Sequence, residues 1–193
     1  ISKEDKIPQR TLVGLLVDKE EIGSEGATSM SSSAFELFLH MMLYKMYGKA
    51  SGLDVLHTLN NSYMLSADVS AAVDPLHESL SDVQNGNILG CGISIEKYTG
   101  SGGKYSANDA SAMYMNKVMS VLDKSGVAYQ MGTLGKIEKG GGGTIAYILA
   151  NKGVEVVDCG TALLSMHSPF ETASVADIYM TYRAYKSFFK DMN

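Results

Sequence analysis

Hydrophobic and polar residues follow one another in short runs along this chain, separated by stretches rich in Gly and Ser. Apolar runs of strand length predict buried strands at residues 11–17, 62–67, 90–97, 127–131, 154–158 and 162–166. Apolar residues at helical spacing predict helices at residues 33–47, 108–124, 144–150 and 174–189. Residues 48–59, 98–105 and 140–143 are expected to be connectors. The alternation predicts an α/β fold, with a mixed central sheet flanked by helices.

Two adjacent carboxylates follow the first predicted strand, in the sequence DKEEIGSE of residues 18–25. Ligands of open α/β sheets bind at the carboxyl ends of strands. Because neighbouring side chains point in different directions, Glu21 can ligate a metal while Glu20 faces a water beside it. A metal-assisted hydrolase needs this combination of a Lewis acid and a general base. A solvated pair of glutamates in a loop remains the alternative.

Two further strand ends carry residues of the same chemistry. Asp68 follows the strand predicted at residues 62–67, and His167 follows the one at 162–166. Carboxylate and imidazole groups suit zinc, with manganese or cobalt as other possibilities, and no thiolate is required. Taken singly, Asp68 is interpretable as a turn former and His167 as part of a capped turn. The glutamate pair, Asp68 and His167 all follow predicted strands of one chain, and this favours a shared metal site.

Composition limits the class of protein. The chain has 193 residues, of which 45% are hydrophobic and 19% charged, as expected for one globular domain over residues 1–193. The net charge of −5 argues against nucleic acid and against a membrane surface as partners. No apolar run reaches the about 18 residues of a membrane span, and no signal-peptide pattern begins the chain. We therefore expect a cytoplasmic protein, with Cys91 and Cys159 as buried reduced thiols.

Four segments together resemble the aspartyl aminopeptidase (aminopeptidase I) family of dinuclear zinc peptidases, from about residue 11 to the last helix. They are DKEEIGSEGATSM, SADVSAAVDP, GGGGTIA and VDCGTALLSMHSPFE, and they occur in the family's order. The tetrahedral glutamyl-aminopeptidase family is a close second resemblance, and the first and last segments favour the first family. The resemblance implies a phosphorylase/hydrolase-like catalytic domain and homo-oligomers, dodecamers among them.

The resemblance also implies roles for individual residues. Glu20 is similar to the family's general base, which accepts a proton from the attacking water. Glu21, Asp68 and His167 are similar to ligands of a pair of zinc ions. The implied reaction is removal of the N-terminal residue from a peptide substrate, with acidic residues as one open preference.

The chain also departs from the family pattern. The family uses a His and a metal-bridging Asp upstream of its Glu-Glu motif, whereas residues 1–19 contain no His and only Asp5 and Asp18. Asp5 is too near Glu20 in sequence for the bridging position. We therefore expect the C-terminal part of a catalytic domain, incomplete at its N-terminus, with part of the metal set. One alternative is that another segment supplies the remaining metal ligands. A second is that the unit is inactive and serves assembly. A third is a different two-metal hydrolase, such as a deacylase or carboxypeptidase.

Several residues are candidates for substrate binding. The run of residues 140–143 lacks the lysine of a nucleotide-binding P-loop, and the resemblance places Gly143 and Thr144 in a loop that lines the active site. Lys97 and Lys104 flank residues 98–103, where the family recognises acidic side chains, and a cation suits that role. His77 is a minor candidate for substrate contact. A mobile loop and solvated lysines remain the alternatives.

Overall fold

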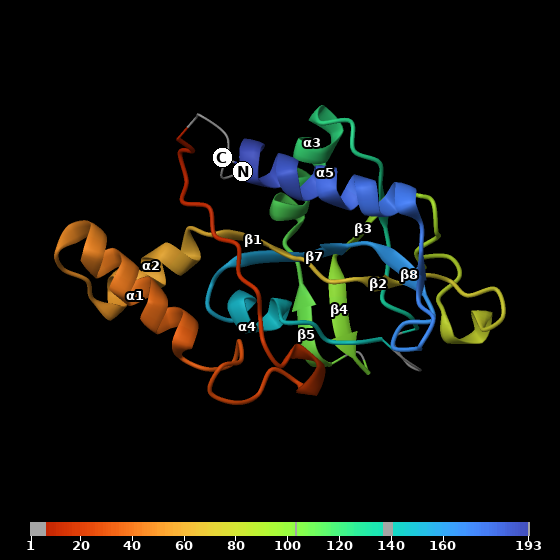
Figure 1. The fold of residues 1–193 in the computed structure, drawn as a ribbon, viewed down its shortest axis with the longest axis horizontal. Coiled ribbons are helices and arrows are strands. Elements are labelled where there is room, and N and C mark those ends of the chain that lie inside the picture. The colour runs from red at the N-terminus through yellow and green to blue at the C-terminus, as the bar shows by residue number, and fades with distance from the viewer. Residues whose placement is uncertain (1–6, 103, 137–140, 193) are drawn as a thin grey trace.

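The computed structural model describes residues 7–102, 104–136 and 141–192 (Figure 1); Asp5 and Gly140 fall outside these ranges. In chain order, the elements are η1 (Glu20–Ile22), α1 (Ala34–Tyr47), α2 (Gly52–Asn60), β1 (Tyr63–Ser66), β2 (Ser70–Ala71), η2 (Glu78–Leu80), β3 (Ile93–Glu96), β4 (Tyr98–Ser101), β5 (Tyr105–Asp109), α3 (Ala112–Lys124), β6 (Tyr129–Met131), α4 (Ala146–Ala150), β7 (Glu155–Gly160), β8 (Ala162–Leu164), β9 (Thr172–Ala173) and α5 (Val175–Asp191).

A four-stranded sheet in the order β1-β7-β3-β6 forms the centre of the molecule. Strands β1 and β7 are parallel, β7 and β3 are antiparallel, and β3 and β6 are parallel. The sheet is therefore mixed, as predicted. A second, small sheet of β2, β8 and β9 continues from the ends of β1 and β7 and carries the loops of the candidate site.

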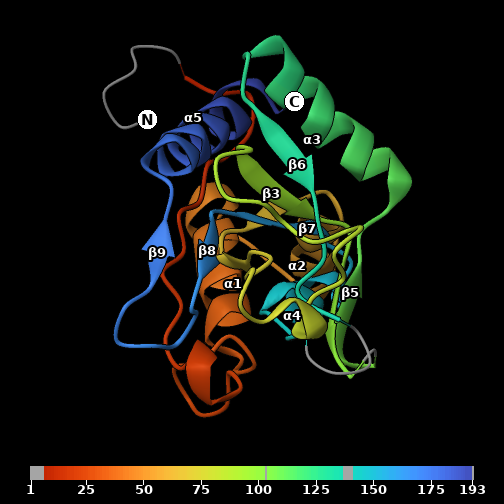
Figure 2. The ribbon, with the colours of Figure 1, turned by 90° about the vertical axis from the view of Figure 1, so that its right-hand side faces the viewer.

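Both faces of the central sheet are covered by helices (Figures 1 and 2). Helices α3 and α5 cover one face and pack with Ile93, Leu122 and Val157 in one apolar cluster. Helices α1, α2 and α4 lie on the other side, where Val156 packs with Leu39 and other apolar residues. Neighbouring residues of a strand point to opposite faces. This explains why the continuous apolar run of β7 supplies both clusters.

The prediction of a strand at residues 11–17 is wrong, because these residues form no strand in the structure. The segment is free of ladder pairing, and only an isolated bridge between Asp18 and Ser29 follows it. Its apolar composition satisfies the local preference for a strand, but a strand also needs a neighbour for its backbone groups. Among the described residues, no strand lies beside it.

Two predicted connectors contain regular structure. Residues 48–59 include α2, which begins with a capping box in which Ser51 and Asp54 bond to each other's backbone N–H. This pattern is a helix-start signal. Residues 98–101 and 105 belong to strands β4 and β5, which pair as a hairpin. The following helix therefore begins at Ala112 rather than at residue 108.

The two cysteines are both free thiols, but they differ in burial. Cys159 is buried in β7 as expected, whereas Cys91 is exposed because it lies in the turn before β3. None of the helices described is both long and apolar enough to cross a membrane.

Candidate metal centre

Glu20 and Glu21 lie in η1, a single tight turn at the end of the extended segment. The turn is flanked by Lys19 and Gly23, both in the left-handed region with φ of +65° and +88°. Glycine adopts this conformation readily, and the reversal places both carboxylates on the short turn. Glu20 is half-buried and Glu21 is exposed.

Asp68 and His167 lie in the loops that follow β1 and β8. One carboxylate oxygen of Asp68 accepts a hydrogen bond of 2.7 Å from the backbone N–H of Val69, which holds the side chain near its own loop. His167 has a φ of +66°, and its backbone N–H donates to Glu171 Oε1 over 2.6 Å. Local bonds therefore hold both loops in shape.

The structure brings Glu21 and His167 together from opposite ends of the chain. The distance from His167 Nε2 to Glu21 Oε2 is 3.4 Å, and the two side chains are 69% and 76% exposed, respectively. Exposed ion pairs contribute little to stability, since water screens them. The pair therefore adds little stability, but it places a carboxylate and an imidazole, both possible metal ligands, within 3.4 Å of each other.

Electrostatics link Glu20 and Asp68 to the same pair. Burial, followed by the negative charges of Asp68 and Glu21, raises the pKa of Glu20, and His167 opposes this shift. Burial also raises the pKa of Asp68, against the bond from Val69, and Glu21 adds to the rise. Like charges disfavour the ionised state of their neighbours. A cation placed among these carboxylates would relieve their repulsion.

The donor chemistry fits zinc, but the set in this chain is partial. Imidazole nitrogen and carboxylate oxygen are both zinc ligands. Within the described ranges, however, no group of three or more His, Cys, Asp or Glu side chains is close enough together to hold a metal ion. Glu21 and His167 supply one adjacent pair, and the charges of both residues affect the pKa of Asp68. The assignment of Glu21, Asp68 and His167 as metal ligands therefore remains a prediction.

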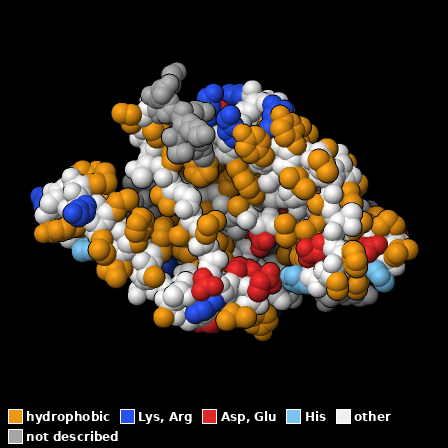
Figure 3. Space-filling view, viewed as in Figure 1, with side chains coloured by type: hydrophobic (Ala, Val, Ile, Leu, Met, Phe, Trp, Pro, Cys, Tyr) orange, Lys and Arg blue, Asp and Glu red, His pale blue; other side chains and the backbone are white. Residues whose placement is uncertain are grey.

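Figure 3 shows acidic side chains gathered beside a histidine on the face seen in Figure 1, below a hollow in the surface. Glu20, Glu21 and Asp68 belong to the wall of a cavity of about 1580 Å³ that also includes residues 10–17 and β1. The candidate site therefore opens into a large, mainly apolar cavity.

The proposed substrate-binding residues have other contacts. Lys97 pairs with Asp109 at the base of the β4–β5 hairpin, while Lys104 and His77 are exposed. Thr144 is buried and donates its hydroxyl to Asp158 Oδ1 over 2.6 Å. A Cβ on Gly143 would lie 2.3 Å from Ser106 Cβ, so a glycine is needed for this approach to the hairpin. No hydrogen bond or ion pair described joins these five residues to Glu20, Glu21, Asp68 or His167, and their substrate roles remain predictions.

Two buried carboxylates next to the site were not identified from the sequence. Glu96 in β3 lies directly opposite Asp158 in β7, and each is 4% exposed. Glu96 accepts bonds from Ser70 Oγ and, over 3.1 Å, from Asn87 Nδ2. Burial raises the pKa of Glu96 to about 7 despite these bonds, and burial also raises the pKa of Asp158.

The Glu96 network connects the centre of the sheet to the loop that carries Asp68. Asn87 bonds to Ser70 Oγ over 2.6 Å and accepts from Ser94 Oγ over 2.6 Å. Ser70 lies two residues after Asp68, at the start of β2. A charged residue inside an apolar strand, as in the sequence ISIE of residues 93–96, was the available signal.

Comparison with known proteins places the chain in one family. The family model for "Aminopeptidase I zinc metalloprotease (M18)" matches residues 2–189. A relative in Borrelia garinii, named as a probable M18 family aminopeptidase 1, is 46% identical over 188 residues, which are 97% of this chain and 41% of the relative. The chain thus spans about two fifths of that relative's length.

Solved structures agree with the assignment. The M18 aminopeptidase of Thermotoga maritima is 45% identical with a TM-score of 0.85, covering 90% of this chain and 38% of its own. The dodecamer of Saccharomyces cerevisiae mApe1 shares the fold at 23% identity, with a TM-score of 0.71 over 91% of this chain and 37% of its own. The matched family is the first of the two that the sequence resembles. The chain therefore belongs to the M18 family of aminopeptidase I zinc metalloproteases.

Proposed function

We propose that this chain forms the part of a zinc aminopeptidase that carries the general base and three metal ligands. The observation that supports this most directly is the convergence of η1 and the His167 turn, with the Glu21–His167 pair at 3.4 Å. The reaction is hydrolysis of the N-terminal peptide bond of a peptide. Family membership supports this class of reaction.

Each residue has a distinct task in this proposal. Metal is held by Glu21, Asp68 and His167. The rest of the complete catalytic domain supplies the remaining ligands for a site of two ions. When bound, zinc supplies a Lewis acid that polarises the peptide carbonyl and acidifies water. Glu20 accepts the proton of the attacking water and passes it to the leaving amine. Its raised pKa favours that transfer, because a base is most effective near the operating pH.

The preference for acidic N-terminal residues is the finer part of the proposal. Lys97 and Lys104 are the cations for this role, with Gly143, Thr144 and His77 as further contacts. Lys97 already has Asp109 as its partner in the structure. Binding of an acidic substrate would therefore require Lys97 to exchange one carboxylate for another.

A second candidate is a unit that contributes to assembly without catalysis. The incomplete ligand set favours this alternative. So does the outer surface of α1, where Phe38, Met41 and Tyr44 are 51–61% exposed. Large exposed apolar patches are typical of surfaces that contact another protein. Contact between copies of the chain is the expected use of this surface.

Peptide hydrolysis with matched variants tests the proposal. The chain, supplied with zinc and with the unmatched portion of the Thermotoga maritima relative, should release the N-terminal residue of unblocked peptides. Glu20→Gln should lower the rate at least about 100-fold while zinc binding stays unchanged, because general-base catalysis contributes about 10²–10⁴-fold. Glu25→Gln is the matched control and should retain activity. Hydrolysis that persists in Glu20→Gln would contradict the proposal, and zinc binding without hydrolysis in the unmodified chain would favour the assembly unit.

A further inference from the structure

The loop that carries Asp68 lies directly against the end of β7. A Cβ on Gly160 would lie 1.5 Å from the backbone oxygen of Asp68, so a glycine is needed for this close approach. Just after the loop, the Ser70 N–H donates to Thr161 O over 2.9 Å. Strand β2 then pairs with β8, which leads toward His167. Backbone contacts therefore connect the loops of two candidate ligands.

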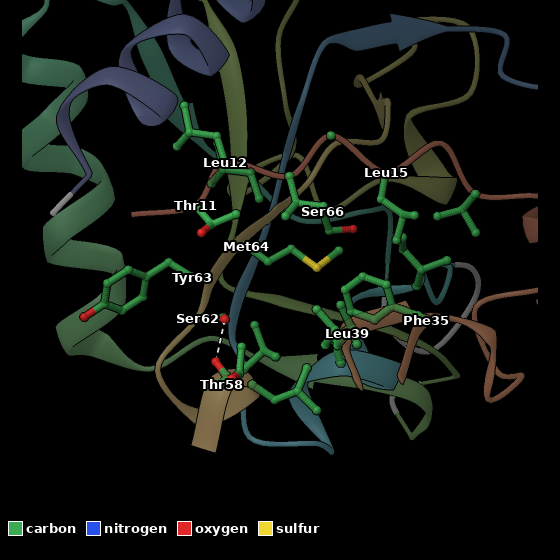
Figure 4. A pocket seen from close by; sticks show the side chains of 18 of the residues that line it. Thr11, Leu12, Leu15, Phe35, Leu39, Thr58, Ser62, Tyr63, Met64 and Ser66 are labelled. Atoms are coloured by element: carbon green, nitrogen blue, oxygen red, sulfur yellow. Dashed lines mark hydrogen bonds between the residues drawn. The ribbon is translucent and has the colours of Figure 1, made fainter. Parts of the chain in front are cut away.

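On one side the Asp68 loop faces the apolar cavity beside the candidate metal centre, since Asp68 belongs to the cavity wall. Figure 4 shows Leu15, Phe35 and Met64 among the side chains that line this cavity. Apolar side chains have no donor or acceptor to offer to a loop. Polar support for the loop therefore has to come from the interior, where Ser70 is buried.

The interior support is the polar face of β3. Neighbouring residues of a strand point to opposite faces of the sheet. Ile93 and Ile95 pack with residues of α3 and α5, so Glu96 points to the opposite side. There it accepts a hydrogen bond from Ser70 Oγ, and Ser70 lies two residues after Asp68. The centre of the sheet is thus bonded to the end of the candidate ligand loop.

Asn87 ties Ser70 and Glu96 together. Its Nδ2 donates to Ser70 Oγ over 2.6 Å and to Glu96 Oε1 over 3.1 Å, and its Oδ1 accepts from Ser94 Oγ over 2.6 Å. A Cβ on Gly132 would lie 1.8 Å from Asn87 Oδ1, so a glycine makes room for the amide. These four polar residues are each at most 4% exposed. The buried network therefore holds Ser70 in one orientation.

Stability alone does not explain a carboxylate at position 96. Burial of a charged group is costly, and apolar side chains of similar volume often serve the fold as well. Asp177 is a second buried carboxylate, and it accepts the backbone N–H groups of Gly90 and Gly92 over 2.6 and 2.8 Å, which fixes the turn before β3. The bonds of Glu96 lead instead to side chains next to the Asp68 loop.

We propose that Glu96 is a positioning residue of the candidate metal centre. It fixes Ser70 through the side chain, while Thr161 fixes the same residue through its backbone N–H. One residue earlier, the Val69 N–H holds the carboxylate of Asp68 over 2.7 Å. Outer partners that orient metal ligands also tune metal affinity. The inference rests on the proposed function in one respect, the role of Asp68 as a ligand.

Two substitutions at Glu96 separate positioning from the loss of a buried charge. Glu96→Gln keeps the oxygen that accepts from Ser70 and Asn87, so the zinc affinity of the whole chain should stay within about twofold. Glu96→Leu removes this acceptor and should weaken zinc binding at least about fivefold. That loss is smaller than the about 10–100-fold typical of a direct partner of a ligand, because Glu96 acts through the loop. Equilibrium dialysis at a series of zinc concentrations measures both affinities.

Hydrogen exchange on individual amides gives a readout that needs no metal. The Ser70 N–H should exchange at least about fivefold faster in Glu96→Leu, because local opening of the loop no longer breaks the bond to Glu96. In Glu96→Gln it should exchange as in the unmodified chain. The amides of α3, which packs on the other face of the sheet, are the internal control and should not change.

A second variant cuts the same link from the loop side and keeps the test valid if Glu96→Leu fails to fold. Ser70→Ala removes the hydroxyl without adding volume, and it should reproduce the weaker zinc binding of Glu96→Leu. Asp177→Asn is the matched control, because it removes an acceptor from the turn before β3. In this control, zinc affinity and exchange of the Ser70 amide should stay within about twofold.

Unchanged zinc affinity and unchanged loop exchange in both Glu96→Leu and Ser70→Ala would overturn the proposal. Equal losses in Glu96→Gln and Glu96→Leu, or in Asp177→Asn, would also overturn it, since they would show a general loss of stability. If the unmodified chain binds no zinc, the proposed function fails, and exchange of the Ser70 amide then decides whether Glu96 positions the loop. If every variant binds zinc normally, the proposed function stands and this inference fails.

Discussion

Strand β7 and residues 11–17 are similar in sequence but differ in their surroundings. Both regions are short runs rich in apolar residues, and the same pattern predicts a strand in each. β7 lies between β1 and β3 with helices on both faces, and Val157 is fully buried. Residues 11–17 have no strand neighbour among the described residues, and Val13 is 39% exposed. The difference shows that local composition specifies a tendency to extend, whereas partners decide whether a strand forms.

The largest difference in stability between the two regions is expected when a charged residue replaces one valine in each. Val157→Asp should destabilise the chain by more than about 4 kcal/mol, because an unpaired charge would enter the core. Val13→Asp should change the free energy of unfolding by less than about 1 kcal/mol, since the site is partly solvated. Urea denaturation measures both values. Equal losses would mean that residues 11–17 are as fully packed as β7.

The pH dependence of stability tests the buried carboxylates of the interior. The pKa of Glu96 is raised from 4.5 to about 7 in the folded chain, mainly by burial. A raised pKa means that folding favours the protonated form, so this contribution is complete below about pH 4.5 and is lost as the pH rises through 7. The charges that face Glu96 are Asp158 and Asp68, and both add to the rise in its pKa.

Replacement by the neutral amide isolates the effect of Glu96. Between about pH 4.5 and 7.5, the chain should lose on the order of 3 kcal/mol of stability through this group. Glu96→Gln should flatten that part of the profile, while Glu25→Gln, at an exposed position, should leave it unchanged. Thermal unfolding across this range provides the measurement. A profile that keeps its slope in Glu96→Gln would show that Glu96 titrates normally.

A smaller loss of stability is expected when the capping box of α2, beside the open cavity, is removed. Ser51→Ala removes the side chain that accepts the Asp54 N–H, and loss of such a cap costs about 1 kcal/mol. Ser111→Ala, which removes the cap of α3 over the covered face, is the matched comparison. Faster amide exchange confined to α2 in Ser51→Ala would show that the open side unfolds locally. Equal effects across the whole chain would show a single cooperative unit.

The sequence was sufficient for most of the fold and for the proximity of Glu21 and His167. The mixed sheet follows from alternating apolar runs. Glu21 and His167 meet because the turn after residues 11–17 and the loop after β8 converge, although residues 11–17 form no strand and β8 belongs to the small sheet. The opposition of Glu96 and Asp158 could not be predicted, because it depends on the register between β3 and β7. The pairing of β4 with β5 and the capped start of α2 were missed, although Ser51 and Asp54 carry a known signal.

The central claim is that the η1 turn and the loops after β1 and β8 supply part of a zinc site. Zinc content after equilibrium dialysis tests it most directly. The unmodified chain, His167→Ala and the matched control His57→Ala would be analysed side by side. His57 is exposed on α2 and is not among the proposed ligands. The account predicts that the unmodified chain and His57→Ala bind zinc equally and that His167→Ala binds at least about tenfold more weakly, as a lost ligand requires. Equal zinc in all three, or no zinc in any, would contradict it.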